Sequence, residues 1–149
     1  MTDVDQRPID VLLKTTIRQE NEFEEFQLHA DGLMYRKNNN LFIKYSEHLE
    51  GQNDTQVLFK IKNKTVRLNR SGDSNTKLIF TQNELLSATY QTAAGQMQLE
   101  TKTELLDVSL SEDYSHGTIK INYQLFAQNA LIGQYEVFLQ FTDKSSKLN

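Results

Sequence analysis

The stretch VLFKIKNKTVRLNRSG, residues 57–72, carries the pattern on which the fold prediction rests. Apolar side chains recur at every second residue from Val57 to Ile61 and again at Val66 and Leu68, which is the period of a strand with one buried face. Asn63-Lys64 between the two runs suits a two-residue hairpin turn, because asparagine tolerates a left-handed backbone. The stretch therefore predicts an antiparallel hairpin that buries one face.

Similar stripes recur on both sides of this hairpin and are separated by short polar turns. The asparagines at 38–40 form one such turn, and Asp31-Gly32 is expected to end the second strand. Residues 84–92 fit a strand better than the short helix that their leucines and alanines also allow. The stripes run over residues 9–17, 26–30, 33–37, 41–47, 57–61, 66–70, 77–80, 86–90, 97–110, 119–125 and 135–141.

One stripe changes parity within the run GQMQLETKTELLDVSL, residues 95–110. Odd positions face inward up to Thr103, and even positions do so from Leu106 onward. A pattern of period two changes parity only when one residue is inserted, which makes a β-bulge. We place this bulge near Glu104–Leu105.

Consecutive strands joined by short turns predict an all-β fold. Such a meander leaves two open edges unless it closes, and a single antiparallel up-and-down β-barrel is the usual solution. The predicted barrel has about eight to ten strands and spans residues 1–142, with a polar C-terminal tail over 143–149. A flattened β-sandwich is the alternative. A barrel of this size is either filled by side chains or holds one small ligand.

The composition narrows the function classes. The chain has 149 residues, which fits one domain, and no cysteine, which excludes disulfides and thiolate chemistry. The N-terminal sequence lacks a signal peptide's basic and apolar parts, and no apolar run is long enough for a membrane helix. We therefore expect a cytoplasmic protein that does not associate with membranes.

The net charge of −4 conceals a basic middle third. Residues 1–31 carry a net charge of −5, residues 32–80 one of +5, and residues 81–149 one of −4. These charges either neutralise one another across neighbouring strands or form a patch that faces an anion. The first interpretation is favoured, because surfaces normally intermix both signs.

The order and spacing of several short motifs point to a known family. These motifs are residues 24–47, the series Val66, Leu68, Arg70, Ser71, Gly72 and Phe80, the series Tyr90, Gly95, Leu99, Thr101 and Thr103, and GTIKINYQL at 117–125. Over nearly the whole chain except the tail, they resemble the YwiB-like proteins of Gram-positive bacteria. The resemblance implies a small cytoplasmic β-barrel with a calycin-like (lipocalin-related) core, and it implies no activity or site residues. Asn83 departs from the family, whose members often have glycine there, but asparagine tolerates the same backbone.

No catalytic, cofactor-binding or metal site is predicted. His29, His48 and His116 have no ligand spacing and fit surface positions. The carboxylates of ENEFEE, residues 20–25, fit a solvated strand end, because neighbouring residues of a strand point to opposite faces. No nucleophile elbow, phosphate loop or dinucleotide fingerprint occurs. We expect a protein that is not an enzyme and takes no cofactor.

The basic hairpin at 57–72 is a candidate anion surface. A turn at Asn63-Lys64 places Lys60 opposite Arg67 on the polar face, where like charges destabilise a sheet unless something offsets them. We expect both side chains to be exposed. The aromatic side chains that stack nucleic-acid bases are absent from this face, so the sequence does not favour nucleic acid as a partner.

Tyrosines are the best pointer to an internal cavity. Tyr35, Tyr45, Tyr90, Tyr123 and Tyr135 fall on or near inward positions. Small-molecule pockets are mainly apolar with a few polar groups of this kind. The alternative places each tyrosine at a barrel rim with its hydroxyl in water. The predicted contacts of an interior or rim ligand are Arg70, Tyr45, Tyr90, Tyr123, Tyr135, Thr101 and Thr103.

Arg70 lies on the inward side of its strand, where an unpartnered guanidinium is costly. One interpretation lets Arg70 cover an end of the barrel with its head on backbone carbonyls or an aromatic ring. The other makes it a hook for the anionic head of a ligand. The first is favoured, because it needs no ligand. The sequence thus predicts a non-enzymatic binder of a small, partly apolar ligand, or else a protein-interaction module with a filled barrel that pairs with a protein or with a second copy of itself. A third and least favoured interpretation is a hydrolase of unrecognised type.

Overall fold

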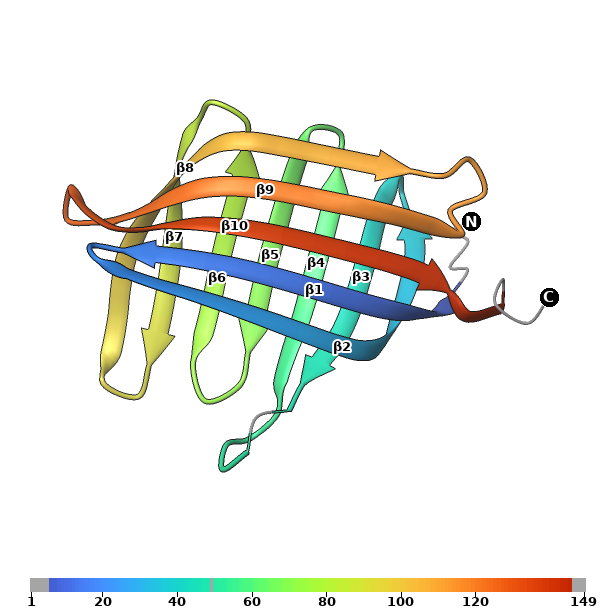
Figure 1. The fold of residues 1–149 in the computed structure, drawn as a ribbon, viewed down its shortest axis with the longest axis horizontal. Helices are drawn as coiled ribbons and strands as arrows, with labels where there is room; N and C mark the ends of the chain where they lie inside the picture. Colours follow the sequence, from blue (N-terminus) through green and yellow to red (C-terminus); the bar gives the residue numbers. More distant parts are fainter. Residues whose placement is uncertain (1–5, 49, 146–149) are drawn as a thin grey trace.

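The computed structural model describes residues 6–48 and 50–145, and these residues form ten antiparallel strands in a closed barrel (Figure 1). Each strand lies beside its neighbours in sequence, and the first meets the last. The predicted all-β antiparallel barrel is confirmed. The strands are β1 (Arg7–Gln19), β2 (Glu22–Lys37), β3 (Asn40–Glu47), β4 (Thr55–Lys62), β5 (Thr65–Ser71), β6 (Asn75–Thr81), β7 (Leu85–Thr92), β8 (Gly95–Leu110), β9 (His116–Ala127) and β10 (Ala130–Asp143).

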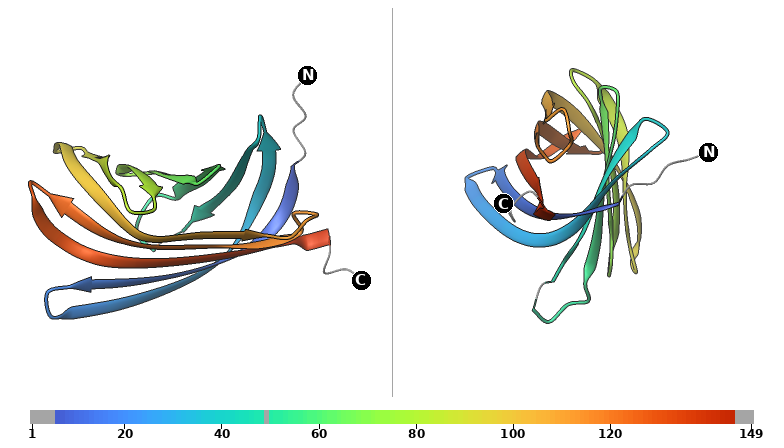
Figure 2. Two further views of the ribbon diagram at one scale, coloured as in Figure 1. Left: turned by 90° about the horizontal axis from the view of Figure 1, so that it is seen from above. Right: turned by 90° about the vertical axis from the view of Figure 1, so that its right-hand side faces the viewer.

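The barrel is flattened into two layers whose strands cross (Figures 1 and 2). In Figure 1, β8, β9, β10, β1 and β2 run across the front, and β3 to β7 run behind them. β2 pairs with β1 over residues 22–34 and with β3 over residues 32–37. β8 pairs with β7 over residues 95–102 and with β9 over residues 100–110. These two long strands are therefore the corners that join the layers.

Gly32 forms the corner in β2. The expectation that Asp31-Gly32 ends a strand is wrong, because β2 runs through both residues. A Cβ atom at Gly32 would lie 2.7 Å from the Lys44 carbonyl oxygen and 3.1 Å from Cγ2 of Val11. Glycine is needed here because two neighbouring backbones approach closely at the bend.

The predicted bulge in β8 is confirmed. Thr103 pairs with Tyr123 and Leu105 pairs with Asn122, so Glu104 is the extra residue. Thr103 is fully buried, and Leu106 packs against the core. Both therefore face inward on opposite sides of the bulge, as the change of parity requires.

The asparagine turns form as predicted. Asn38 and Asn39 have φ of 54° and 66°, and Asn63 has φ of 55° in the turn that pairs Lys62 with Thr65. Asn83 also takes a left-handed backbone, with φ of 68°. Residues 85–92 form a strand rather than a helix.

The two ends of the barrel differ in how they are filled. The closed half is the half beside the turns at 38–39, 63–64 and 82–84, and the mouth half lies beside the turns at 20–21, 72–74 and 128–129. Many fully buried side chains come from strand segments in the closed half, among them Ile9, Val11, Met34, Ile43, Val66, Phe80, Ile119, Leu139 and Phe141.

The described ends of the chain lie side by side, because β1 pairs with β10. β10 continues to Asp143, whose carboxylate lies 3.6 Å from the Arg7 guanidinium. Residues 1–5 and residues 146–149 of the predicted tail lie outside the described residues. Within residues 6–48 and 50–145, no helix is both long enough and apolar enough to span a membrane.

Candidate functional site

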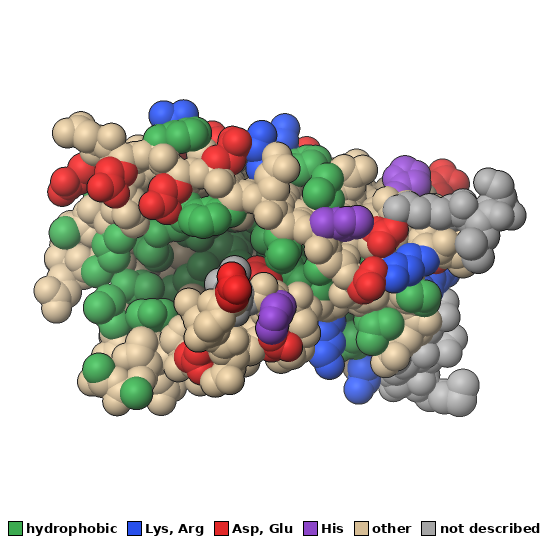
Figure 3. Space-filling model, turned by 60° about the horizontal axis from the view of Figure 1, so that its bottom comes forward, with side chains coloured by type: hydrophobic (Ala, Val, Ile, Leu, Met, Phe, Trp, Pro, Cys, Tyr) green, Lys and Arg blue, Asp and Glu red, His purple; other side chains and the backbone are tan. Residues whose placement is uncertain are grey.

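The mouth half of the barrel contains a cavity of about 620 Å³ between the two layers. The space-filling view shows a hollow lined with hydrophobic side chains on this face (Figure 3). All ten strands contribute to its wall, which is mainly apolar. The lining residues are Leu13, Thr15, Ile17, Phe26, Gln27, Tyr45, Glu47, Phe59, Leu68, Arg70, Thr76, Leu78, Tyr90, Met97, Leu99, Tyr123, Leu125, Ile132, Tyr135 and Val137.

Strand register explains which polar side chains reach the cavity. In the back layer, Tyr45, Val57, Arg70, Thr76 and Tyr90 are directly paired one after another across five strands. Directly paired residues point to the same face of a sheet. A single row of the sheet therefore places two tyrosines, a threonine and an arginine on the inner face.

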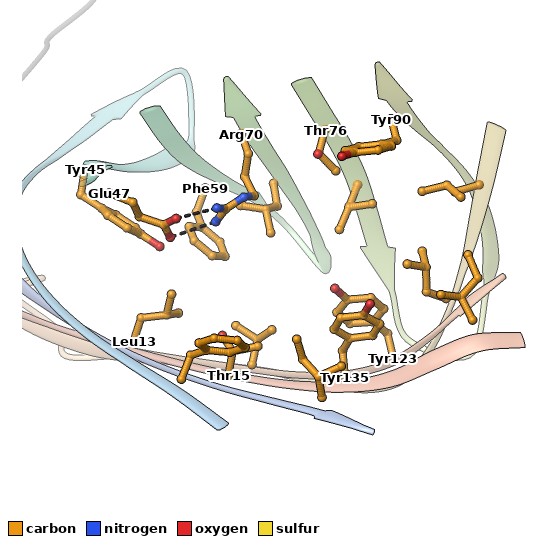
Figure 4. A pocket seen from close by; sticks show the side chains of 18 of the residues that line it. Leu13, Thr15, Tyr45, Glu47, Phe59, Arg70, Thr76, Tyr90, Tyr123 and Tyr135 are labelled. Atoms are coloured by element: carbon orange, nitrogen blue, oxygen red, sulfur yellow. Dashed lines mark hydrogen bonds and ion pairs between the residues drawn. The ribbon is translucent and has the colours of Figure 1, made fainter. Parts of the chain in front are cut away.

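Two stacked tyrosines form part of the opposite wall. Tyr123 and Tyr135 are paired across β9 and β10, and their rings stack with centroids 5.0 Å apart. Figure 4 shows both rings rising from the front layer, with their hydroxyls directed toward the side of the cavity that carries Arg70. The two layers thus present their polar groups to a shared space.

Arg70 forms an ion pair with Glu47 inside the cavity (Figure 4). Its two terminal nitrogens donate to the two carboxylate oxygens at 2.9 and 2.5 Å, which is the bidentate geometry that favours strong pairing. The Arg70 side chain is 34% exposed and the Glu47 side chain 10%. The prediction that the Arg70 head contacts backbone carbonyls or a ring is wrong, because a carboxylate two strands away satisfies it.

The sequence interpretation missed Glu47, although a signal for it existed. Leu41, Ile43 and Tyr45 alternate inward along β3, and the next step of that alternation is Glu47. The same reasoning that turned Arg70 inward applied to this residue. Two inward side chains of opposite charge, near the same end of strands that lie close together, predict an ion pair.

Two tyrosine hydroxyls are harder to ionise in the folded barrel because they are buried. Burial raises the pKa of Tyr45, and the Glu47 carboxylate adds to the effect. Burial also raises the pKa of Tyr123, with a smaller contribution from Tyr135. Burial alone would lower the pKa of Arg70, but its hydrogen bonds to Glu47 and the charge of that carboxylate outweigh burial and raise it. The cavity thus holds one cation, one anion and neutral hydroxyls.

The Tyr45 hydroxyl is a buried polar group without a hydrogen-bond partner among the described residues. Its residue is only 3% exposed, and its ring lies beside the ion pair in Figure 4. Such a group normally finds a partner, since an unpaired buried hydroxyl costs free energy.

The remaining predicted contacts divide between the cavity and other places. Tyr90 and Tyr135 line the cavity. Thr101 and Thr103 are fully buried but do not line it, and the Thr101 hydroxyl donates to the carbonyl of Ile79 at 2.8 Å. Tyr35 faces outward and stacks on Phe42, with centroids 4.7 Å apart. The prediction that Tyr35 lies on or near an inward position is wrong, because successive residues of a strand face opposite sides and Tyr35 lies on the outer one.

The basic hairpin lies on the outside of the barrel. Lys60 pairs with Arg67, as predicted. Arg67 is exposed, but Lys60 is half-buried, with its Nζ 5.7 Å from the centre of the Phe42 ring. The aromatic face offsets part of the repulsion between the two cations, so the expectation that both are exposed holds for Arg67 alone.

The histidines are exposed, as predicted. His29 lies 3.8 Å from the carboxylate of Asp10, and His48 contacts Asp54 at 2.5 Å. Among the described residues, no three His, Cys, Asp or Glu side chains are grouped so that they could hold a metal ion.

The closed half carries the cation–aromatic contact that the sequence interpretation assigned to Arg70. The Arg36 guanidinium lies 4.1 Å from the centre of the Tyr114 ring. Both residues border a smaller hollow of about 380 Å³, together with Asn40 and Asn63. A basic side chain thus lies over an aromatic ring at one end, but it comes from β2.

Comparisons with known proteins agree with this architecture. An uncharacterized beta-barrel protein, YwiB, from Bacillus subtilis (strain 168) is 27% identical over 121 residues, which are 80% of this chain and 82% of that protein. The crystal structure of ywiB protein from Bacillus subtilis matches with a TM-score of 0.82 at 20% identity and covers 94% of both chains. The YwiB-like resemblance is therefore confirmed.

A match to a protein-family model shows which family the chain belongs to. The sequence model of a family described as a domain of unknown function, DUF1934, matches residues 11–139. This range includes strand residues on both walls of the cavity as well as the Arg70–Glu47 pair. The chain therefore belongs to the DUF1934 family.

Proposed function

We propose that this protein is a non-enzymatic binder of a small, partly apolar ligand, which it holds in the mouth half of the barrel. The observation that carries the proposal is the cavity of about 620 Å³ lined by side chains from all ten strands. Sites for drug-sized ligands have volumes of roughly 300–1,000 Å³ and combine apolar walls with a few polar groups. A calycin-like relationship and a cytoplasmic location form part of the same proposal.

Exposed apolar side chains at the mouth support this function over a filled barrel. Phe26 and Met97 line the cavity and yet are 53% and 49% exposed. A packed interior would cover both, so they are placed as an entrance for an apolar molecule. The interaction-module alternative, which includes a homodimer, predicts instead that this apolar rim is covered by a second chain.

A cavity-filling substitution tests the proposal. Thr15 faces the cavity (Figure 4), and Thr15→Trp places an indole in the space that a ligand would occupy. The matched control is Thr89→Trp, because Thr89 lies between the inward residues Ala88 and Tyr90 and faces outward. The chain has no tryptophan, so each variant also gains a single fluorescent reporter.

Native mass spectrometry of the protein purified from its own cells reads the outcome. We expect the wild type and Thr89→Trp to carry a bound small molecule, and Thr15→Trp to lose it while its melting temperature stays close to that of the wild type. A wild type that carries no small molecule and appears as a dimer would replace this proposal with the interaction module.

A further inference from the structure

The charges inside the cavity cancel each other. Among the described residues that line it, Arg70 and Glu47 are the only charged ones, and each satisfies the other in a bidentate pair. A charged ligand group entering this space would meet no unpaired opposite charge. Burying a charge without compensation is very costly, so the lining discriminates against both anions and cations.

The charge around the mouth does not favour an anion either. The described residues of the turns at the mouth, 20–21, 48, 50–54, 72–74, 93–94 and 128–129, include Glu20, Glu50, Asp54 and Asp73 but no lysine or arginine. The neighbouring start of β2 adds exposed glutamates. Arg18 near the end of β1 and Lys77 near the start of β6 are exposed basic residues beside the mouth. The acidic side chains outnumber these two, so the local field disfavours an approaching carboxylate or phosphate.

Arg70 and the hydroxyls that line the cavity can donate hydrogen bonds to a ligand. A guanidinium has five N–H groups, and Glu47 accepts one hydrogen bond from each of the two terminal nitrogens of Arg70. Tyr90, Tyr123 and Tyr135 add hydroxyls to the wall. Donors of this kind suit an uncharged oxygen, such as that of an alcohol, an ester or an amide.

We infer that the ligand is an uncharged, mainly apolar molecule whose oxygen accepts hydrogen bonds beside the Arg70–Glu47 pair. This inference rests on the proposed function and narrows it, because it excludes free fatty acids and alkylamines as preferred ligands. Glu47 is then the residue that determines which ligand charge is accepted. Its carboxylate pairs with the Arg70 guanidinium, which would otherwise attract an acidic ligand.

Three probes with one alkyl chain and different heads test the inference. Decan-1-ol, decanoate and decylammonium compete at neutral pH with the uncharged fluorescent probe N-phenyl-1-naphthylamine for the wild-type protein. We expect decanol to displace the probe at a concentration at least about tenfold lower than either ion, since each ion must lose its hydration without a free counter-charge.

A change at Glu47 should shift this ranking. Glu47→Gln keeps the side-chain shape and leaves the Arg70 charge uncompensated, so decanoate should gain at least about tenfold relative to decanol. Glu84→Gln is the matched control: it removes the same charge from an exposed residue in the turn before β7, in the closed half, and should leave the ranking unchanged. If Glu47→Gln does not fold, the wild-type ranking still decides the matter.

The outcomes separate this inference from the proposed function. Decanoate or decylammonium as the tightest wild-type ligand would overturn the uncharged-ligand inference and leave the binding function standing. If neither N-phenyl-1-naphthylamine nor any of the three amphiphiles binds the wild type, the proposed function itself fails.

Discussion

Arg70 and Glu47 each occupy the inward position of a strand near the mouth, two strands apart. Val57 of the intervening strand pairs directly with Arg70 and with Tyr45, the inward neighbour of Glu47. The two charges therefore lie diagonally across one strand, close enough for a long guanidinium to reach the carboxylate. Their pairing explains why an arginine continues an apolar stripe: it keeps charge in the interior without leaving that charge unpaired.

Removing one partner of this pair should destabilise the fold more than removing both. Arg70→Leu leaves the Glu47 carboxylate buried and unpaired, and we expect a loss of roughly 3 kcal/mol in the free energy of unfolding. The double variant Arg70→Met with Glu47→Leu removes both charges and should regain most of that loss. Urea titration measures both values. A double variant no more stable than Arg70→Leu would show that the carboxylate is not what destabilises the single variant.

Elements whose register depends on local sequence could be predicted. The corner at Gly32 could not, because it depends on residues far away in the sequence. The bulge at Glu104 follows from a change of parity within one strand, and the asparagine turns follow from backbone preferences of the residues themselves. Gly32 follows an aspartate, which is the usual signature of a turn. Its actual role depends on Lys44 and Val11, which lie in other strands, so the local pattern gave no means of recognising it.

Deleting Glu104 should be far more damaging than changing it. The deletion removes the extra residue between Thr103 and Leu105, and a one-residue slip then turns Leu106, Val108 and Leu110 away from the core. We expect a loss of several kcal/mol, visible as a large fall in the melting temperature. Glu104→Ala keeps the chain length and should melt close to the wild type. If both variants have the same melting temperature, the extra residue is not needed to keep Leu106, Val108 and Leu110 in the core.

At the scale of the whole molecule, alternation of apolar residues indicates which face a side chain occupies but not whether the space is full. The inward positions of Tyr45, Tyr90, Tyr123 and Tyr135 could be predicted because each follows the period of its strand, whereas Tyr35 faces outward. The cavity could not, since its volume depends on how far apart the two crossed layers lie. The same limit applies to Thr101 and Thr103: both point inward, but they lie outside the cavity wall.

The folded barrel should couple tyrosine ionisation to unfolding at alkaline pH. Burial raises the pKa of Tyr45 and Tyr123 above the ordinary value, so ionisation of either hydroxyl opposes the fold. The free energy of unfolding falls as the pH rises above about 10, because the unfolded chain ionises there while the folded chain keeps both protons. Tyrosinate absorbance and circular dichroism, recorded together, should show a late ionisation step that coincides with loss of the sheet. The step should shrink when both residues are changed to phenylalanine, and its persistence there would contradict the assignment.

Residues 22–31 of β2 hydrogen-bond to β1 on one side, and on the other side no strand of the described chain pairs with them. A barrel normally protects its strands from joining other chains by leaving no edge, and this one keeps an open edge beside its mouth. Exposed glutamates at 22, 24 and 25 lie along that edge. Like charges on an open strand oppose the stacking of a second copy. The acidic segment thus opposes aggregation along this stretch of unpaired strand backbone.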